Sequence, residues 1–354
     1  MVVLNKALIL CTTLLLIGSC ELINPPPAPT SEPPVLRGTD FSQLPKIEQE
    51  GFLFYNQDST MIDPLLLLKD RGINCIRLKV WNNPTGDGSL NELIPLVQRI
   101  KNHQLMLMLT LHYSNTWADP GQQLIPSQWS NLSHEVLLDS VYDFTRHVTE
   151  LLKPDYVQIG NEINHGLMHP AGLRNGNGNF QRLLQAGVSA VKSVDTSITT
   201  LIHYAGYDNA QIFFQTIDTI DFDAAGLSYY PRWHGKNLTE LEAACFDLQD
   251  DLGRPVFLLE TSYPFTLDWA DWTNNHIGSI NQILDDFPPT RNGQAAFISA
   301  MRQISDSLGT GLVYWGGELV PYMGPQSQDG SPYENQALFN FNGVELPVIS
   351  ALGN

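Results

Sequence analysis

The chain has 354 residues, of which 43% are hydrophobic and 16% are charged, and its formal net charge at pH 7 is -18. This composition is typical of a folded protein with a large core and not of a disordered chain. An acidic surface repels nucleic acid and anionic lipid headgroups, so we expect a neutral or cationic ligand and no nucleic-acid partner.

The first twenty residues are typical of an export signal. Lys6 supplies a positive n-region, and residues 7–17 supply an apolar h-region that is too short to span a bilayer as a mature helix. The segment ends in Ile-Gly-Ser-Cys at residues 17–20, which resembles a bacterial lipobox, so we expect Cys20 to be lipidated. The alternative is an ordinary signal peptide with a chance cysteine near its end.

Residues 21–36, ELINPPPAPTSEPPVL, are rich in proline and predict a semi-rigid linker. Such a spacer would hold a folded domain of residues 37–354 away from a membrane to which an acyl chain tethers it. We therefore expect an exported lipoprotein at the outer membrane or the cell surface, attached to the membrane only through this anchor. Glu21, which stands directly after the lipobox cysteine in place of Asp, favours the outer membrane.

Two cysteines, Cys75 and Cys245, lie outside the export segment. Cys75 opens a predicted core strand, whereas Cys245 lies on a predicted outer helix, so the two should lie on different sides of the fold. We expect two buried free thiols, although the exported compartment leaves a disulfide open as the alternative.

From residue 35 onward, apolar strand-like runs alternate with amphipathic helical stretches. The near-continuous apolarity of the strand-like runs is typical of a parallel sheet that is buried on both faces. In chain order these runs are VLRGTDF (35–41), NCIRLKVW (74–81), LMLMLTLHY (105–113), YVQIGNE (156–162), TTLIHYAG (199–206), AAGLSYYP (224–231), PVFLLETSY (255–263) and GLVYWGGE (311–318). The predicted helices between them span residues 63–71, 90–103, 135–152, 180–194, 238–251 and 294–307.

Eight strand and helix units predict one α/β domain, a single (β/α)8 TIM barrel, which we expect to be a monomer. The alternative is an open, doubly wound sheet, which also alternates strands and helices. No G-x-G-x-x-G follows an early strand, and GLRNGNGN at residues 172–179 indicates a long loop after the fourth strand. The count of eight therefore favours the barrel.

Polar or aromatic residues stand at the ends of seven predicted strands. The carboxyl ends of barrel strands surround one cavity, so these side chains should converge there. In chain order they are Arg77 and Trp81, His112 and Tyr113, Asn161 and Glu162, His203 and Tyr204, Tyr229 and Tyr230, Glu260, and Trp315. Each alone has an ordinary structural explanation, but seven at one rim indicate a site.

Two glutamates among them, Glu162 and Glu260, indicate glycoside hydrolysis. That reaction needs a proton donor and either a nucleophile or a base for water, so two carboxyl groups suffice and no cofactor is required. Flat aromatic faces would contact sugar C–H surfaces, while Asn, His and Asp side chains would bind the hydroxyls. The aromatic candidates are Trp81, Trp117, Trp233 and Trp315.

Other enzyme classes lack their motifs in this chain. There is no G-x-S-x-G elbow, no H-E-x-x-H helix and no P-loop. His112 and His203 are potential metal ligands, as in barrel amidohydrolases, but those enzymes need H-x-H on the first strand, which VLRGTDF does not have. We therefore expect no catalytic metal.

Several motifs together resemble glycoside hydrolase family 53, the endo-β-1,4-galactanases, within the retaining clan of (β/α)8 enzymes. They are RLKVWNNP (77–84), LHYSNTWADPGQQ (111–123), QIGNEINHG (158–166), GLSYYPRWHG (226–235), LLETSYPFT (258–266) and SPYENQALFNFNG (331–343). The resemblance covers nearly the whole domain. It implies an endo-acting, retaining hydrolase of β-1,4-galactan in pectic side chains.

The resemblance implies Glu162 as the general acid/base and Glu260 as the nucleophile. Asn161 resembles the clan asparagine that binds the sugar 2-hydroxyl, and Tyr229 and Arg77 resemble the groups that keep the nucleophile ionised. The expected substrate-binding residues are Arg77, Trp81, His112, Trp117, Asp119, Asn161, His203, Tyr229, Trp233 and Trp315.

The resemblance also allows a structural calcium ion, because some family members bind one in the loops after the seventh and eighth strands. Asp268, Asp271 and Asn275 are oxygen donors in the matching loop, although LDWADWTNNHIG lacks the dense acidic spacing of a strong site. Two alternatives to a galactanase remain open: another retaining barrel glycanase, such as a mannanase or cellulase, and a surface lipoprotein that binds a glycan without cutting it.

Overall fold

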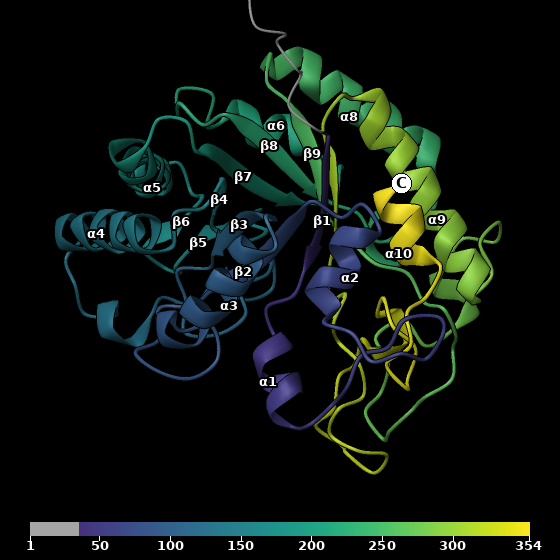
Figure 1. Cartoon of the computed structure of the whole chain (residues 1–354). Coiled ribbons are helices and arrows are strands. Elements are labelled where there is room, and N and C mark those ends of the chain that lie inside the picture. The colour runs from purple at the N-terminus through teal and green to yellow at the C-terminus, as the bar shows by residue number, and fades with distance from the viewer. Residues whose placement is uncertain (1–34) are drawn as a thin grey trace, which may run out of the picture. The chain divides into compact units, whose positions relative to one another are not determined.

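The computed structural model describes residues 35–354, whose strands close into one parallel eight-stranded barrel (Figure 1). The barrel strands are β1 (Leu36–Asp40), β2 (Cys75–Val80), β3 (Met106–Leu111), β4 (Tyr156–Ile159), β7 (Thr199–Ala205), β8 (Ala224–Ser228), β9 (Val256–Thr261) and β10 (Gly311–Tyr314). Each pairs in parallel with the next, and β1 pairs with β10 to close the ring. The predicted (β/α)8 barrel and its eight strands are confirmed.

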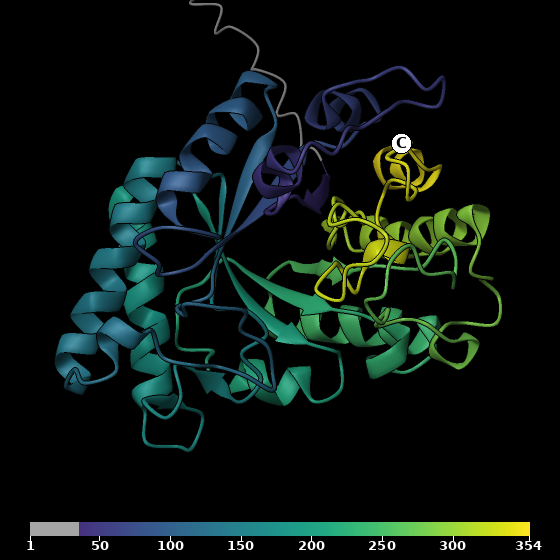
Figure 2. The same ribbon diagram turned by 90° about the horizontal axis from the view of Figure 1, so that it is seen from below.

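Six long or medium helices surround the barrel and match the predicted ones closely. They are α2 (Pro64–Asp70), α3 (Leu90–Asn102), α4 (His134–Leu152), α5 (Asn179–Val194), α8 (Leu238–Leu252) and α9 (Arg291–Ser307). Figure 2 shows the strands crossing the centre with these helices outside. Across the described residues, no helix has both the length and the apolarity that a membrane crossing requires.

The elements that the sequence did not predict are all short. They are α1 (Leu44–Gln49), α6 (Ala210–Gln215), α7 (Pro231–His234), α10 (Val348–Gly353), the 3-10 turns η1 (Ser127–Trp129), η2 (Ile280–Gln282) and η3 (Glu334–Gln336), and the antiparallel pair β5 (Gly166–Leu167) and β6 (Gly172–Leu173). A segment of six residues or fewer completes less than two helical turns, so it has too few positions to show a period. The strands β5 and β6 lie in the long loop that was expected after the fourth strand.

Alternate strand residues face either the helices or the barrel interior. The lower interior is an apolar layer that consists of Leu36, Cys75, Met108, Leu201, Ala224, Phe257, Leu259 and Val313, with Met106 and Tyr156 packed against it. Because side chains alternate along a strand, positions two and four residues beyond this layer also face inward, nearer the carboxyl end. The polar residues at these positions are Asp40, Arg77, Lys79, Thr110, His112, His203 and Ser228, which places a polar site directly above the apolar layer.

The cysteines and the N-terminal segment differ in how far the structure bears on their expected states. Cys75 and Cys245 are both buried free thiols, as expected. The expected signal segment, the lipobox and nearly all of the Pro-rich linker lie outside the described residues, and β1 begins at Leu36.

Candidate active site

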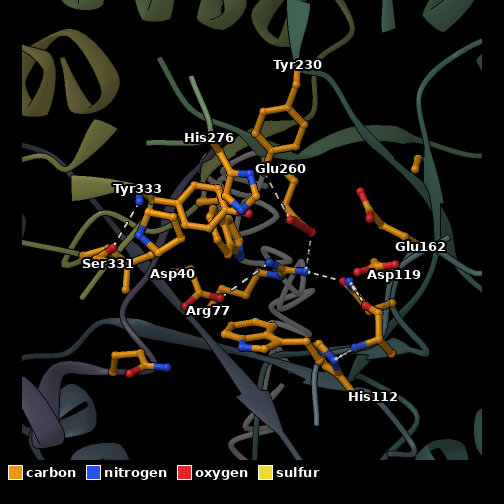
Figure 3. Close-up of a pocket in the computed structure, with 18 of the residues that line it drawn as sticks. Asp40, Arg77, His112, Asp119, Glu162, Tyr230, Glu260, His276, Ser331 and Tyr333 are labelled. Carbon is orange, nitrogen blue, oxygen red and sulfur yellow. Dashed lines mark hydrogen bonds and ion pairs between the residues drawn. The ribbon is translucent and has the colours of Figure 1, made fainter. Parts of the chain in front are cut away.

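A cavity of about 900 Å³ opens at the carboxyl ends of the strands (Figure 3). Its lining includes Asp40 from β1, Arg77 from β2, Asn161 and Glu162 after β4, and Glu260 from β9. The seven strand ends that the sequence singled out therefore surround one cavity, although some of the side chains are covered by others.

The turn after β4 points Asn161 and Glu162 into this cavity. Gly160 has φ 77° and Glu162 has φ 48°, both in the left-handed region that residues other than glycine rarely adopt. A Cβ at residue 160 would lie 2.6 Å from the side chain of Ile163, so glycine is required there. Strain of this kind, held at Glu162 by the surrounding structure, is typical of functional residues.

Glu260 reaches the cavity because β9 carries an irregularity. Leu227 pairs with Leu258, but the next residue, Ser228, pairs with Glu260, so β9 has one extra residue. Leu259 faces the interior, and strict alternation would turn Glu260 outward. The bulge resets the alternation and directs the carboxyl inward.

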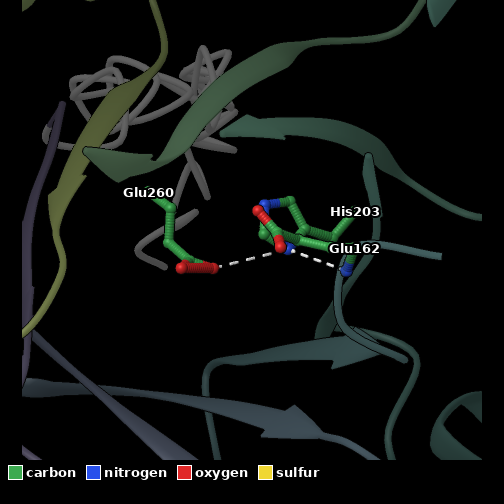
Figure 4. A group of neighbouring side chains, drawn as sticks. All are labelled: Glu162, His203 and Glu260. Carbon is green, nitrogen blue, oxygen red and sulfur yellow. Dashed lines mark hydrogen bonds and ion pairs between the residues drawn. The ribbon is translucent and has the colours of Figure 1, made fainter. Parts of the chain in front are cut away.

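The carboxyls of Glu162 and Glu260 lie close together beside His203 (Figure 4). One oxygen from each carboxyl and one nitrogen from His203 all lie within 4.8 Å of one another. Glu260 accepts hydrogen bonds from Arg77 Nη2 at 3.2 Å and from the hydroxyl of Tyr230 at 3.3 Å. Glu162 instead accepts one from the hydroxyl of Ser228 at 2.5 Å.

These different partners give the two carboxyls different proton affinities. Burial, reinforced by the negative charge of Glu260, raises the pKa of Glu162 to about 8. Burial also raises the pKa of Glu260, but the charge and hydrogen bond of Arg77 and the hydrogen bond of Tyr230 oppose that rise. A shared proton therefore resides on Glu162, and Glu260 is the ionised partner at neutral pH.

His203 lies beneath the carboxyls with no exposed surface. Burial lowers the pKa of its imidazole, as does the charge of Arg77, so the ring is neutral. The side-chain amide of Gln158 lies 3.0 Å from Nδ1, and the hydroxyl of Ser228 lies 2.9 Å from Nε2. If Nδ1 accepts from the amide, Nε2 carries the proton and donates it to Ser228, whose hydroxyl is then free to donate to Glu162.

This arrangement does not fit a metal site, although Glu162, His203 and Glu260 are near enough to one another to be ligands. A histidine that binds a metal must offer it the lone pair of one ring nitrogen. In His203 the Nδ1 lone pair already accepts from the backbone N–H of Glu162 at 3.4 Å, and Nε2 lies 2.9 Å from the hydroxyl of Ser228. The donor set instead suits proton transfer.

Five aromatic residues, which we call the aromatic wall, form one side of the cavity. They are Trp117, Trp315, Tyr333, His276 and Trp233. Successive ring centroids along this series lie 6.0, 4.4, 4.7 and 6.5 Å apart. The three tryptophans were expected to line the cavity, but His276 and Tyr333 were missed because long loops carry them and neither stands at a strand end.

His112 and Asp119 line the cavity, as expected. Nδ1 of His112 accepts a hydrogen bond from the backbone of Ala118 at 3.1 Å, which leaves the Nε2 proton to serve as a donor to a ligand. Burial lowers the pKa of this imidazole, and the ring is therefore neutral. Asp119 is exposed and its Oδ1 accepts from the backbone of Gly121 and Gln122.

The expected role of Tyr229 is wrong, because Tyr230 holds the nucleophile candidate. Tyr229 is fully buried and donates its hydroxyl hydrogen bond to the carbonyl of Gly235. Ser228 faces the cavity at the end of β8, so the alternation turns the next residue away and brings Tyr230 back. Either tyrosine was consistent with the sequence, because the register was unknown.

Three other expected substrate-binding residues are more than nine-tenths buried. His203 is fully buried, as described above. Trp81 is 7% exposed and lies behind Trp117, whose ring covers it edge-on at 5.3 Å. Arg77 is 2% exposed, and its guanidinium is bonded to Asp40, Gln158, Asn161 and Glu260. Of these three residues, Arg77 lines the cavity, whereas the rings of His203 and Trp81 lie behind the lining residues.

Comparison with known proteins agrees with this geometry. The model of the family described as "Glycosyl hydrolase family 53" matches residues 36–352. An arabinogalactan endo-β-1,4-galactanase of Cellvibrio japonicus is 32% identical, and the match covers 80% of this chain and 80% of that protein. An endo-β-1,4-galactanase of Bacillus subtilis is 28% identical, and the match covers 89% of this chain and 84% of that protein. The solved catalytic domain of an Ignisphaera aggregans family 53 protein superposes with a TM-score of 0.84 at 34% identity, covering 90% of this chain and 95% of that one.

Proposed function

The chain belongs to glycosyl hydrolase family 53, and from that premise we propose that it is a retaining endo-hydrolase of β-1,4-galactosidic bonds in galactan or type I arabinogalactan. The substrate class is supported by the relatives from Cellvibrio japonicus and Bacillus subtilis, which carry that activity in their names. The mechanism is supported by one observation above all: the carboxyls of Glu162 and Glu260 have oxygens no more than 4.8 Å apart but different partners, Ser228 for the first and Arg77 with Tyr230 for the second.

The short separation favours retention of configuration. Retaining glycosidases hold their carboxyls about 5 to 5.5 Å apart, whereas inverting enzymes leave about 6.5 to 9.5 Å for a water molecule. Glu260 attacks the anomeric carbon while Glu162 protonates the departing glycosidic oxygen, which gives a covalent glycosyl-enzyme. Glu162, now ionised, takes a proton from a water molecule that attacks the same carbon and releases Glu260.

The remaining lining residues supply substrate contacts for this reaction. The aromatic wall offers flat apolar faces to sugar C–H surfaces. The side-chain amide of Asn161 donates one hydrogen to the carbonyl of Ala118 at 2.8 Å, which leaves its second hydrogen for a sugar hydroxyl such as the 2-hydroxyl. His112 donates from Nε2, and Asp119 accepts.

Reducing ends released from galactan, mannan and cellulose test the proposal against its alternatives. We expect release from galactan alone, with an early fall in viscosity that marks internal cleavage. Release from mannan or cellulose would instead favour a neighbouring clan activity. Glycan binding without release, equal in the wild type and the Glu260→Gln variant, would favour a non-catalytic binding protein.

We propose that catalysis itself needs no cofactor, since Glu162 and Glu260 supply both the proton and the nucleophile. Whether a calcium ion stabilises the fold is a separate question from catalysis. The residues relevant to it lie in the loops after β9 and β10. Three buried oxygens there have no partner within the described residues: Asp271 Oδ2, Asn275 Oδ1 and Glu334 Oε2. The charge of Asp271 also raises the pKa of the neighbouring Glu334 carboxyl, after burial as the main cause.

This donor set fits a hard cation, because two carboxylates and an amide oxygen are ligands that calcium prefers. We propose that Asp271, Asn275 and Glu334 would hold the ion and thereby join the two loops. Asp268, which the sequence also suggested, bonds its carboxylate to the hydroxyl of Thr266 and is exposed. Glu334 replaces Asp268 in the proposed set of calcium ligands. It lies in the loop after β10, which the sequence analysis did not connect with calcium binding through any named residue.

We also propose that the protein is an exported lipoprotein, a monomer tethered through Cys20 and the linker of residues 21–36. The basis is the sequence alone, since these residues lie outside the part of the chain that the structure describes. Replacing Cys20 by Ser should release active enzyme from the membrane fraction with unchanged turnover. Membrane attachment that survives the substitution would refute the anchor.

A further inference from the structure

A buried lysine lies directly behind the aromatic wall. Lys79 on β2 is 1% exposed, and lysine is almost never buried to that extent unless its charge is paired. Its Nζ lies 4.3 Å from the centroid of the Trp117 ring and 4.4 Å from that of Trp81. The carboxylate of Asp87 lies 3.0 Å away and pairs with the charge.

The strand pattern explains how an ammonium comes to this place. Cys75, Arg77 and Lys79 are alternate residues of β2 and all face the barrel interior. Arg77 is thus level with Glu260, and Lys79 lies one step nearer the rim. The loop after β3 then carries Trp117 across the mouth, so that its ring covers the ammonium and faces the cavity.

The indole of Trp117 is held by ring contacts and by this cation. Within the described residues, no protein group hydrogen-bonds its Nε1. The rings of Trp81, His112 and Trp315 lie against it at centroid distances of 5.3, 5.7 and 6.0 Å, all at steep angles. Such edge contacts constrain a ring in position, while a cation attracted to its face selects its tilt.

We propose that Lys79 is a positioning residue for substrate binding: its ammonium, fixed by Asp87, sets the tilt at which Trp117 presents its ring to a sugar. The inference rests on the proposed function, because it takes Trp117 to be a sugar platform. Lys79 itself touches no substrate and takes no part in bond breaking.

Asp87 also connects Lys79 to Gln43, a residue that lines the cavity. Its Oδ2 also accepts a hydrogen bond at 3.2 Å from the side-chain amide of Gln43, which lines the cavity from the loop after β1. Removing the carboxylate would leave the buried ammonium without its counter-charge, which favours its displacement from between the rings. The variants Asp87→Asn and Lys79→Met should therefore have the same consequence.

The first measurement separates charge from packing. Lys79→Met keeps an unbranched side chain of similar length but removes the cation, and Lys79→Arg keeps a cation. We expect Met to raise KM for galactan about three- to tenfold with kcat within about twofold, and Arg to restore much of the loss. A Met variant with wild-type KM would mean that Lys79 only fills space and would overturn the proposal.

The second measurement is a double-mutant cycle with Trp117→Ala. If Lys79 acts through the ring, Lys79→Met should have no further effect on KM once the ring is gone. Effects that multiply in the double variant would show that Lys79 acts elsewhere, against the proposal. Should the Met variant fail to fold, Asp87→Asn takes its place in the cycle, because the Asp87 side chain is 36% exposed and tolerates substitution better.

The controls distinguish this inference from the function on which it rests. A wild type that cleaves mannan or cellulose in place of galactan would overturn the proposed substrate, and the same cycle would then be measured on that glycan. A wild type that cleaves galactan, with independent effects of Lys79 and Trp117, would overturn the positioning role alone.

Discussion

The hydroxyl of Ser228 lies 2.5 Å from Oε1 of Glu162 and connects the end of β8 to the turn after β4. A donated hydrogen bond stabilises the ionised form of a carboxyl, so this contact limits how far burial raises the pKa of Glu162. The same hydroxyl meets Nε2 of His203, which fixes its direction. Ser228 therefore influences the pH at which the acid/base loses its proton.

Replacing Ser228 by Ala should move the alkaline limb of the kcat/KM profile to higher pH, by up to about one unit, because the carboxylate loses a stabilising donor. We also expect kcat to fall about three- to tenfold as Glu162 becomes less well oriented. Ser262→Ala is the matched control, since that buried serine bonds Gln336 away from the cavity and its loss should leave the limb in place. An alkaline limb that stays fixed or moves down in Ser228→Ala would contradict this account.

The raised pKa of Glu162 also predicts how stability depends on pH. The folded state holds the Glu162 proton up to pH about 8, while the unfolded chain releases it near 4.5, so the free energy of unfolding should fall as pH rises between these values. Glu162→Gln removes that penalty without changing the shape. Calorimetry should find equal melting temperatures at pH 4 and a higher one for the variant at pH 8 to 9; the reverse order would argue against a raised pKa.

Tyr230 and Tyr229 form a natural pair for testing the environment of the nucleophile. Tyr230→Phe removes a donor to Glu260, so we expect kcat to fall about tenfold and the acid limb of the profile to move to higher pH. Tyr229→Phe removes a bond to the carbonyl of Gly235 and should lower the melting temperature with little change in kcat. Equal kinetic effects of the two substitutions would restore the role first expected for Tyr229.

The sequence predicts that a strand ends near these two tyrosines but not which of them faces the cavity. The run AAGLSYYP shows that a strand ends near them, because apolarity and strand length are local properties. Which ring faces the cavity depends on the register of β8, and the direction of Glu260 depends on an extra residue in β9. Register and bulges are set by pairing with neighbouring strands, so no local pattern contains them.

The tertiary contacts of loop residues could not be predicted from the sequence at all. The strand-end rule found Trp315, which directly follows β10, but could not find Tyr333, although the two rings lie 4.4 Å apart. Glu334 is likewise buried against a loop more than sixty residues earlier in the chain, where it accepts from the backbone of Ala270. Long loops bring such residues together through tertiary contacts that have no periodic signal.

Glu334 also provides a test of cation binding. Excess calcium should raise the melting temperature by about 2 to 4 °C, and a chelator should reverse the gain, because an ion bound only by the folded state stabilises it. Glu334→Gln should remove most of the gain, whereas Asp268→Asn should keep it, since the Asp268 carboxylate bonds Thr266 instead. A gain that depends on Asp268 and not on Glu334 would place the ion elsewhere.

The roles of the two catalytic carboxyls are distinguished by azide rescue. Replacing Glu260 by Ala should abolish turnover, because no covalent glycosyl-enzyme forms. Azide should then occupy the vacated space, attack the anomeric carbon directly and give a glycosyl azide of inverted configuration. The Tyr230 and Arg77 donors remain in place in this variant, so the loss belongs to the nucleophile itself.

Replacing Glu162 by Ala removes the proton donor and leaves the nucleophile intact. Galactan hydrolysis should fall about 10²- to 10⁴-fold, while an aryl galactoside with a good leaving group, which needs no protonation, should still glycosylate Glu260. Azide would then attack the glycosyl-enzyme in place of water and yield a product of retained configuration. Product stereochemistry is read by proton NMR, and opposite outcomes in the two variants would exchange the roles of Glu162 and Glu260. Near-normal galactan cleavage by both variants would place the reaction at other residues of the rim.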